Sequence, residues 1–368
     1  MLKGRATPEA TSAYASRFPG LPGNFRPMIG LSVSSIGIGT YLGDPDEETD
    51  RQYQAAIAAA LRGGINLIDT AVNYRFQRSE RVIGRVLAEM ESRGEIHRDE
   101  IVVATKGGYI TFDGEVPADP RGWFEERFIR TGIVNPQDVV EGSHCMTPRW
   151  LEAMLAMSCE NLGLETIDIY YLHNPETQLN SISRPEFLGR IRTAFETLER
   201  AAADGRIGVY GTATWNGYRI APTERAWLSL EELWRIAHEV GGDHHHFRAI
   251  QFPYNLAMPE AVTMANQPVR SQRATTLAVA AAMGLGVCAS ASLLQGRLAG
   301  GLPPILKEAF AGFTSDAQRS IQFVRSTPGI NVALVGMKTA AHVADTLATA
   351  SQPPATQEQL MKLFRPAT

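Results

Sequence analysis

The sequence predicts a closed (β/α)8 barrel, a TIM barrel, and three observations support this fold class. Eight short apolar segments each precede a longer segment with helical periodicity, so strand and helix alternate along the chain. The segment at residues 167–173 is a nearly continuous apolar run, as in a parallel strand that is buried on both faces. No G-x-G-x-x-G segment follows a strand and opens a helix, which disfavours the alternative of an open doubly wound sheet.

The expected elements follow one another in order. Strands are predicted at residues 35–39, 65–69, 101–106, 167–173, 207–212, 249–253, 286–290 and 332–336. Helices are predicted at residues 50–62, 79–91, 147–162, 185–204, 228–240, 274–283, 315–325 and 341–350. Gly63 and Gly64 stop the first helix, Ser79 is the expected N-cap of the second, and Thr147 with Pro148 opens the third.

With 368 residues, the chain is expected to form one barrel domain with additions. Residues 31–352 are assigned to the barrel, which carries a long loop insertion at 107–146 after the third strand. Residues 1–30 form an N-terminal extension that covers the domain, and residues 353–368 form a C-terminal tail. Barrels of this class form single domains even when insertions lengthen them.

Composition excludes several classes of protein. Apolar residues make up 44% and charged residues 20% of the chain, which argues against extended disorder. The net charge is −4 and no long basic run occurs, so we expect no nucleic-acid partner and no membrane partner. No signal peptide is evident, and the uncharged residues 274–296 are too rich in Ala, Ser and Thr for a membrane span. Cys145, Cys159 and Cys288 lack C-x-x-C spacing, which suits the cytoplasm.

Ionisable side chains end three of the first four predicted strands. Asp69, Lys106 and His173 close apolar segments, and Tyr74 follows Asp69 by five residues. In a (β/α)8 barrel the carboxyl ends of the strands surround the active site. An unpaired charge at the inner end of such a strand is costly. Because Asp69 and Lys106 end neighbouring strands, we expect them to form an ion pair.

These residue types suit the transfer of a proton to a carbonyl oxygen. A free tyrosine titrates near ~10, and a nearby ammonium is expected to lower the pKa of Tyr74 by stabilising the phenolate. Tyr74 would then act as a general acid, or as a general base in the reverse direction. Neutral His173 would donate a hydrogen bond to the same oxygen. The set contains no nucleophile, so another group must deliver hydride.

Other interpretations of these residues are weaker. A single strand-ending Asp, Lys or His is more often a satisfied structural group, but the combination on successive strands favours catalysis. A metal-dependent hydrolase is disfavoured, because only Asp69 and His173 could bind a metal and Lys106 lies between them. No metal site is expected elsewhere: the adjacent histidines 244–246 indicate a solvated turn. Cys145 beside His144 lacks a third, orienting group.

The sequence resembles the aldo-keto reductases, nicotinamide-dependent barrels with a Tyr, Lys, Asp and His tetrad. The D-T-A-x-x-Y element and the strand-ending Lys106 and His173 are the specific part of this resemblance. It implies that Tyr74 donates the proton, Lys106 lowers its pKa, Asp69 pairs with Lys106, and His173 orients the carbonyl. The matching segments span most of the chain: residues 36–41, 65–74, 79–87, 102–108, 162–176, 208–216, 249–256 and 333–347.

The resemblance also implies an extended cofactor site across the mouth of the barrel, with NADP(H) favoured over NAD(H). The nicotinamide half would meet Gly39, Thr40, Tyr41, Asp69 and Gln251. The loop after the seventh strand would wrap the pyrophosphate through the backbone of residues that include Ala291, Ser292, Leu293 and Arg297. The start of the last helix would meet the adenosine phosphate through Gly336, Met337 and Lys338, because a helix N-terminus favours anions.

Several positions depart from the pattern of the family. Ala213 and Thr214 stand where a Ser-Asn or Ser-Arg pair commonly contacts the carboxamide. Ser290 replaces an aromatic residue on the nicotinamide face, and His342 replaces an arginine that many NADPH users carry. Thr214 can keep one hydrogen bond to the carboxamide, and Lys338 can still bind a 2′-phosphate.

The expected partner is a small carbonyl or alcohol substrate, and the expected assembly is a monomer or a small homo-oligomer. The insertion could line a pocket for an apolar or aromatic carbonyl, or it could pack on the barrel as a lid without touching substrate. Its aromatic residues are Tyr109, Phe112, Trp123, Phe124 and Phe128. The alternative function is a cofactor-binding regulatory subunit similar to the potassium-channel beta subunits, since the changed carboxamide and stacking positions could slow hydride transfer.

Overall fold

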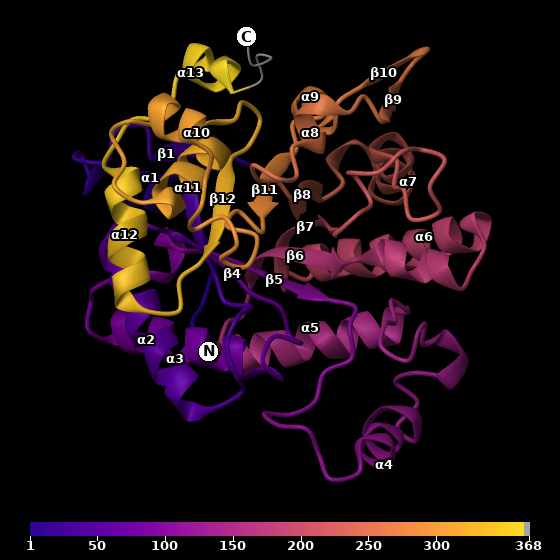
Figure 1. Ribbon diagram of the computed structural model, residues 1–368. Helices are drawn as coiled ribbons and strands as arrows, with labels where there is room; N and C mark the ends of the chain where they lie inside the picture. Colours follow the sequence, from indigo (N-terminus) through magenta and orange to yellow (C-terminus); the bar gives the residue numbers. More distant parts are fainter. Residues whose placement is uncertain (364–368) are drawn as a thin grey trace.

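The structure, a computed structural model, describes residues 1–363 and confirms the closed barrel. Eight parallel strands form a ring in the order β11–β12–β3–β4–β5–β6–β7–β8 (Figure 1). They are β3 (Ile36–Gly39), β4 (Leu67–Asp69), β5 (Val102–Gly107), β6 (Ile167–His173), β7 (Ile207–Ala213), β8 (Phe247–Pro253), β11 (Gly286–Ser290) and β12 (Val332–Gly336). All eight predicted strands are present, and their ends differ from the prediction by a residue or two.

A helix follows each barrel strand and covers the outside of the ring (Figure 1). These helices are α2 (Glu47–Arg62), α3 (Arg78–Ser92), α5 (Pro148–Leu162), α6 (Arg184–Ala203), α7 (Leu230–Gly241), α9 (Thr276–Ala282), α11 (Asp316–Ser326) and α12 (Ala340–Ala350). α2 begins earlier than predicted because Asp46 is its N-cap and accepts the Thr49 N–H at 2.8 Å.

Two of the predicted helix starts differ in detail. The prediction that Ser79 caps α3 is wrong, because the N-cap is Gln77, whose φ of 73° is left-handed. Ser79 lies inside the helix, and its hydroxyl donates to the backbone oxygen of Thr40 at 2.9 Å. Thr147 does stand at the N-cap of α5, but its side chain caps no backbone N–H and instead lies 3.3 Å from Cys145 Sγ.

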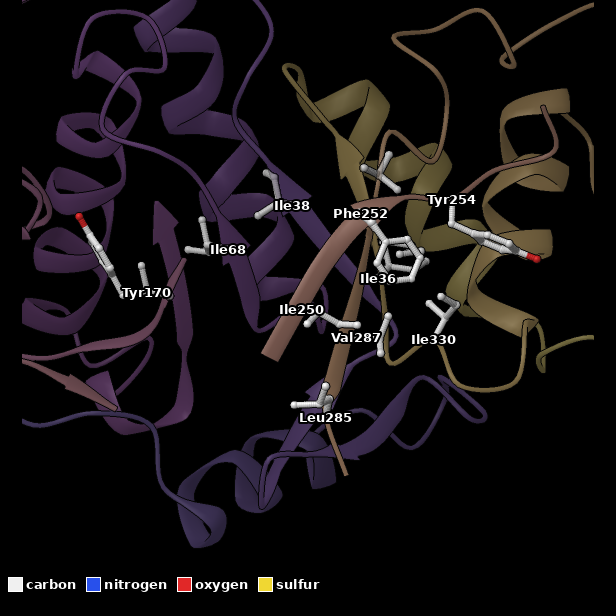
Figure 2. Packing of buried hydrophobic residues seen from close by; sticks show 14 of the residues in the cluster. Ile36, Ile38, Ile68, Tyr170, Ile250, Phe252, Tyr254, Leu285, Val287 and Ile330 are labelled. Carbon is white, nitrogen blue, oxygen red and sulfur yellow. The ribbon is translucent and has the colours of Figure 1, made fainter. Parts of the chain in front are cut away.

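Apolar side chains hold the strands from both sides. Because side chains alternate along a strand, the strands contribute to an inner cluster within the barrel and to an outer cluster against the helices; β3 is the exception, since its inward positions are Gly37 and Gly39. Leu67 and Cys288 belong to the inner cluster. Ile36, Ile250 and Val287 belong to the outer one (Figure 2). This packing fixes the carboxyl ends of the strands, called the upper end of the barrel below, where their last side chains meet.

The first 34 residues close the opposite, lower end of the barrel. They form α1 (Pro8–Ser16) and an antiparallel hairpin of β1 (Phe25–Met28) and β2 (Leu31–Ser34). The Ala6 N–H donates to Asp168 Oδ1 at 2.7 Å, which ties this segment to the start of β6. Met28 lies directly below β11, so close that a Cβ on Gly286 would stand 2.7 Å from its Cγ.

The remaining elements are short and lie at the periphery. The insertion after β5 projects to one side of the barrel, and the β9–β10 hairpin projects on another (Figure 1). No helix within residues 1–363 is long and apolar enough to cross a membrane. Of the expected C-terminal tail, residues 364–368 lie outside the described residues. The short elements are α4 (Pro120–Phe124), α8 (Glu260–Thr263), β9 (Gln267–Val269), β10 (Gln272–Ala274), α10 (Pro304–Ala309), α13 (Gln357–Lys362), η1 (Arg98–Glu100), η2 (Glu125–Ile129), η3 (Pro136–Asp138), η4 (Pro175–Asn180) and η5 (Gly242–His244).

Candidate active site

A cavity of about 550 Å³ opens at the upper end of the barrel. Its volume is within the range of small-molecule sites. Seven of the barrel strands reach it with a residue at or near their last position, namely Gly39, Asp69, His173, Ala213, Gln251, Ser290 and Gly336. The cavity therefore stands where the fold class predicts an active site.

Of the four residues predicted as catalytic, called the tetrad below, Asp69, Tyr74 and His173 line this cavity, and Lys106 lies against Asp69 and Tyr74. Lys106 Nζ donates to Asp69 Oδ1 at 2.7 Å and to the backbone oxygen of Thr70 at 2.7 Å. The same amine lies 3.4 Å from the Tyr74 hydroxyl. The second oxygen of Asp69 accepts the Gln251 amide at 2.7 Å. The predicted ion pair is thus present, with Lys106 between Asp69 and the phenol.

Lys106 lowers the pKa of Tyr74, as predicted, but the net direction is upward. Burial raises the pKa of Tyr74, and this exceeds the lowering by Lys106. The sequence shows the cation but gives no measure of how much water the barrel mouth excludes. For Lys106, burial lowers the pKa, because it disfavours the charged amine. Asp69 and Tyr74 raise the pKa by more than burial lowers it, so the net direction is upward. The resting site therefore holds a neutral phenol beside a charged ammonium, which makes the phenol more acidic than an equally buried one without Lys106.

His173 is neutral, as predicted. Burial holds its pKa well below the usual range, and Lys106 and His144 add to this. Nδ1 of His173 is buried without a partner among residues 1–363, so a proton there would have no acceptor in this part of the chain. The proton therefore belongs on Nε2, the nitrogen free to donate. The ring of His173 stands edge-to-face against Tyr74, with centroids 5.9 Å apart.

The chain leaves Tyr74 in a left-handed turn of unusual composition. Arg75, Phe76 and Gln77 have φ values of 51°, 54° and 73°. Residues other than glycine rarely adopt this conformation, and each such residue costs of order 1 kcal/mol or more. The turn persists because other segments hold it. One such contact is the Gln77 amide, which donates to the backbone oxygen of Phe112 in the insertion at 2.7 Å.

Arg75 supplies the strongest of these holding contacts. Its side chain is only 1% exposed and forms an ion pair with Asp50. The same guanidinium donates to the backbone oxygens of Asp44 at 2.8 Å and Asp46 at 3.1 Å. Arg75 thus joins the turn after the phenol to the loop after β3, which places Tyr41 at the cavity mouth.

Most of the predicted cofactor residues line this cavity, and three do not. Arg297 is exposed, Met337 is fully buried in the core, and Lys338 lies against Gly43. None of these three side chains belongs to the lining. The predicted residues that do line the cavity are Gly39, Thr40, Tyr41, Asp69, Thr214, Gln251, Ser290, Ala291, Ser292, Leu293, Gly336 and His342.

The lining fits a nicotinamide dinucleotide. The loop after β11 contains left-handed residues at Ala291 and Leu294, and the backbone N–H groups of residues 292, 293 and 295 have no acceptor within the described chain. Successive free N–H groups of this kind bind phosphate oxygens. The buried hydroxyl of Thr214 also has no partner in the part of the chain that the structure describes. Unpaired hydrogen-bonding groups therefore lie at both the expected pyrophosphate position and the expected carboxamide position.

Several lining residues escaped the sequence reasoning. Asn73, Asn174 and Trp215 each stand next in the chain to a residue that was singled out. Asp345 lies one helical turn beyond His342 on α12. Adjacency to the strand ends was therefore the available signal, because the loops that leave a strand end must run along the same cavity.

Of the five aromatic residues in the insertion, only Tyr109 lines the cavity. Its ring stands edge-to-face against His173, with centroids 5.0 Å apart. Trp123, Phe124 and Phe128 instead pack together in a separate cluster on Trp150. Most of the insertion therefore packs on the barrel, which is the second of the two expectations.

The remaining polar candidates have structural partners. The expected solvated turn at the three adjacent histidines is wrong for His245, which is buried and packs edge-to-face on Trp234. His144 Nδ1 accepts from the Gln178 amide, and burial raises the pKa of Cys145, so these neighbours form no nucleophilic pair. Within residues 1–363, no group of three or more His, Cys, Asp or Glu side chains could hold a metal ion.

Comparison with known proteins agrees with this geometry. The chain is 28% identical over 208 residues to the NADH-specific methylglyoxal reductase of Escherichia coli, and 29% identical over 184 residues to a D-threo-aldose 1-dehydrogenase of a Pseudomonas species. These matches cover 55% and 50% of this chain and 54% and 50% of the relatives, so the chain spans about half the length of each.

Solved structures agree over nearly the whole fold. An aldo/keto reductase from Klebsiella pneumoniae in complex with NADP and acetate has a TM-score of 0.61 at 22% identity, with 93% of this chain and 94% of that chain covered. A glycerol dehydrogenase from Gluconobacter oxydans has a TM-score of 0.63 at 20% identity, with the same coverage. The model of the aldo/keto reductase family matches residues 35–301. This protein therefore belongs to the aldo/keto reductase family.

Proposed function

We propose that this protein is a nicotinamide-dependent oxidoreductase that reduces the carbonyl of a small aldehyde or ketone, or oxidises the matching alcohol or sugar. The observation that carries the proposal is the Tyr74 hydroxyl, which lies in the cavity 3.4 Å from Lys106 Nζ. A neutral phenol beside an ammonium is a proton donor whose conjugate base is stabilised as it forms. The relatives named as a reductase of methylglyoxal and a dehydrogenase of aldoses support this class of reaction.

The tetrad divides the work of proton transfer. In the reducing direction, the substrate oxygen lies between the Tyr74 hydroxyl and His173 Nε2, and Tyr74 transfers its proton to that oxygen. Lys106 stabilises the phenolate, and Asp69 keeps Lys106 charged and in place. His173 donates a hydrogen bond to the substrate oxygen and so fixes the orientation of the carbonyl. In the oxidising direction the phenolate accepts the proton from the alcohol.

Hydride is supplied or accepted by NADP(H), favoured over NAD(H), when it is bound. Thr214 and Gln251 are the candidates to hold the carboxamide, and the loop of residues 291–297 is the candidate to hold the pyrophosphate. Lys338 and His342 flank the start of α12 and are the candidates for the adenosine phosphates. The Klebsiella structures, solved with NADP and NADPH, support the choice. The Escherichia coli relative is named NADH-specific, so both cofactors belong in the test.

The proposed setting is the cytoplasm, where the protein acts as a monomer or small homo-oligomer without nucleic-acid or membrane partners. The three cysteines are free thiols, two of them buried, which supports a reducing compartment. We keep the division into an extension (1–30), a barrel (31–352) and a tail (353–368) as part of this proposal. Size-exclusion chromatography with light scattering tests the assembly.

The decisive experiment follows the absorbance of reduced cofactor with a panel of neutral aldehydes and ketones. We expect turnover in the wild type, and we expect Tyr74→Phe to lose turnover while fluorescence titration shows unchanged cofactor binding. Full activity in Tyr74→Phe would refute the role of the phenol. Tight cofactor binding with no turnover of any substrate would instead favour a regulatory subunit.

A further inference from the structure

The ring of His173 lacks the hydrogen bond that commonly orients a histidine in an active site, since its Nδ1 is buried without a partner among residues 1–363. The rings of Tyr74 and Tyr109 pack edge-to-face against it, with centroids 5.9 Å and 5.0 Å away. The direction of Nε2 in His173 therefore depends on these two rings and on the backbone from which the side chain extends.

The peptide group that follows His173 is held at both ends. Its carbonyl oxygen, on His173, accepts a hydrogen bond from Nε2 of His144 at 2.7 Å. Its N–H, on Asn174, donates to the backbone oxygen of Ala213 at 2.6 Å. Asn174 has a left-handed φ of 43°, a conformation that persists where surrounding contacts hold it. The two hydrogen bonds therefore fix the turn at the end of β6, from which the His173 side chain extends.

The imidazole of His144 reaches this carbonyl because a glycine leaves room for it. The pairing of β5 with β6 ends at Gly107, opposite Leu172, so the carbonyl of His173 lies one residue beyond the paired part of the two strands. The next residue of β5, Gly108, has a φ of 149°. A Cβ there would stand 2.8 Å from Nε2 of His144 and 2.9 Å from the oxygen of His173. The backbone thus accommodates the side chain of His144 at the position where strand pairing stops.

A chain of hydrogen bonds determines which nitrogen of His144 carries the proton. A guanidinium can only donate, and that of Arg190 donates to the Gln178 side-chain oxygen at 2.6 Å. The amide nitrogen of Gln178 therefore faces His144 and donates to its Nδ1 at 2.8 Å. Burial lowers the pKa of His144 to about 4, so the ring carries a single N–H near neutral pH. That N–H is at Nε2, which donates to the carbonyl of His173.

We propose that His144 is a positioning residue for His173: by holding the backbone carbonyl of His173, it keeps the His173 imidazole directed at the oxygen of the substrate. The inference rests on the proposed oxidoreductase function and adds a residue of the insertion to the group that supports the tetrad. His144 is 1% exposed and does not line the cavity, so it acts on the reaction through His173. A displacement of about 1 Å in an active-site group can lower a rate about 10²-fold, so small movements of this backbone matter.

The first experiment compares His144→Leu with His144→Gln on the aldehyde that the wild type reduces fastest. Leucine has no N–H, so kcat should fall about tenfold for the lost hydrogen bond. Glutamine carries an N–H at a similar reach, so its kcat should stay within about threefold of the wild type. Fluorescence titration should show unchanged cofactor binding in both variants, because His144 lies outside the cavity.

A double-mutant cycle separates positioning from a general structural role. His144→Leu is repeated in the His173→Gln background, where the imidazole to be positioned is absent, and single turnovers with bound reduced cofactor detect slow variants. We expect His144→Leu to lower the rate by less than about twofold there, against about tenfold in the wild type. A residue that only supports the fold would give the same loss in both backgrounds.

Gln178→Leu gives an independent test that leaves His144 in place. Without the Gln178 amide, the proton of His144 can move to Nδ1, where it no longer reaches the carbonyl of His173. We expect kcat to fall about twofold to fivefold. The control is His245→Leu, because His245 is also buried but packs on Trp234, with ring centroids 4.5 Å apart, and does not line the cavity. Its kcat should equal that of the wild type.

Wild-type kcat in His144→Leu would overturn this inference, and so would equal losses in the two backgrounds of the cycle. Either result leaves the proposed function standing. If His144→Leu does not fold, Gln178→Leu decides, and wild-type kcat in that variant overturns the inference. Reduction of no carbonyl by the wild type would overturn the inference together with the proposed function.

Discussion

Two buried ion pairs occupy opposite ends of the barrel and differ in what surrounds them. At the lower end, Arg98 and Asp168 lie 2.8 Å apart with side chains that are 4% and 3% exposed. Both oxygens of Asp168 also accept backbone N–H groups, from Ala6 at 2.7 Å and from Val103 at 2.8 Å. Every contact of this pair is with the protein itself, so its role is to join the extension, η1 and β6.

At the upper end, Lys106 and Asp69 form an equally close pair, at 2.7 Å, on the edge of a cavity. Here the third donor direction of the ammonium is toward the Tyr74 hydroxyl, and that contact is long at 3.4 Å. The second Asp69 oxygen holds Gln251, a candidate cofactor residue. The comparison teaches that burial of a charge pair does not define its role. A loosely held group that faces a cavity distinguishes a reactive pair from a structural one.

The largest effect that separates the two ends is expected from Lys106→Met. Loss of the ammonium leaves a buried phenol with nothing to stabilise its conjugate base, so kcat/KM should fall by about 10²- to 10⁴-fold. Steady-state kinetics at saturating cofactor measure this. Asp168→Asn is the matched control at the lower end, and a comparable loss of activity there would remove the distinction between the pairs.

Asp168→Ala should have the second largest effect, on stability and not on chemistry. It leaves Arg98 without its partner and two backbone N–H groups without an acceptor, so the free energy of unfolding should fall by about 3–5 kcal/mol. Urea denaturation would measure the loss of stability. An enzyme assay on the folded fraction would show that activity is unchanged. Unchanged stability would mean that the ion pair of Arg98 and Asp168 contributes no more to the free energy of unfolding than a solvent-exposed ion pair does.

The ends should also differ in their response to pH, because the upper end holds buried neutral imidazoles. Burial lowers the pKa of His144 from 6.5 to about 4. Between these two values the unfolded chain binds a proton at His144 and the folded chain does not, so stability is lost as pH falls from 6.5 toward 4. The linked loss is about 3 kcal/mol.

The measurement is the free energy of unfolding at pH 7.5 and near pH 4 for the wild type and for His144→Gln. Glutamine does not titrate, so the loss of unfolding free energy between pH 7.5 and pH 4 should be smaller in the variant by about 3 kcal/mol. Equal pH dependence in both proteins would contradict a buried neutral His144.

The smallest effect is expected from Arg75→Lys, which tests whether a third buried pair supports the chemistry indirectly. Lysine cannot reproduce the contacts of the guanidinium with Asp50 and two backbone oxygens, so the loops that carry Tyr41 and Tyr74 should loosen. We expect kcat/KM to fall about fivefold to tenfold, roughly 1 kcal/mol. Arg85→Lys is the control, because Arg85 faces the same Asp50 but is 56% exposed. Equal effects of the two variants would argue against a positioning role.

The same comparison explains how far sequence reasoning reached. The upper pair was predictable because Asp69 and Lys106 end neighbouring apolar strands, where a charge has few possible partners. The lower pair was not predicted. Asp168 stands inside an apolar strand, which is a signal in itself, but its partner Arg98 belongs to η1, a single short turn without a periodic sequence pattern. The hydrophobic pattern of the sequence locates charged residues at strand ends well. An ion pair whose partner lies outside the periodic segments can be identified only from the three-dimensional structure.

Two further misses have related physical causes. The direction of the Tyr74 pKa depends on exclusion of water by several loops together, and no single segment encodes that. The hold of Arg75 on the loop after β3 depends on a left-handed turn built from three residues that ordinarily avoid it. The barrel itself was predictable because eight repeats of one pattern reinforce each other, and an error in one repeat does not change the fold.

The hydrogen bond from Ala6 to Asp168 joins positions that are 162 residues apart in the chain. A ribosome adds roughly 5–20 residues per second, so the first segment emerges roughly 10–30 s before its acceptor exists. A segment that is made well before its docking site is therefore among the last to dock. During synthesis the nascent chain must keep the buried side chains of this segment, such as Tyr14 and Met28, from associating elsewhere. Variants that weaken the docking should therefore give lower yields of newly made protein.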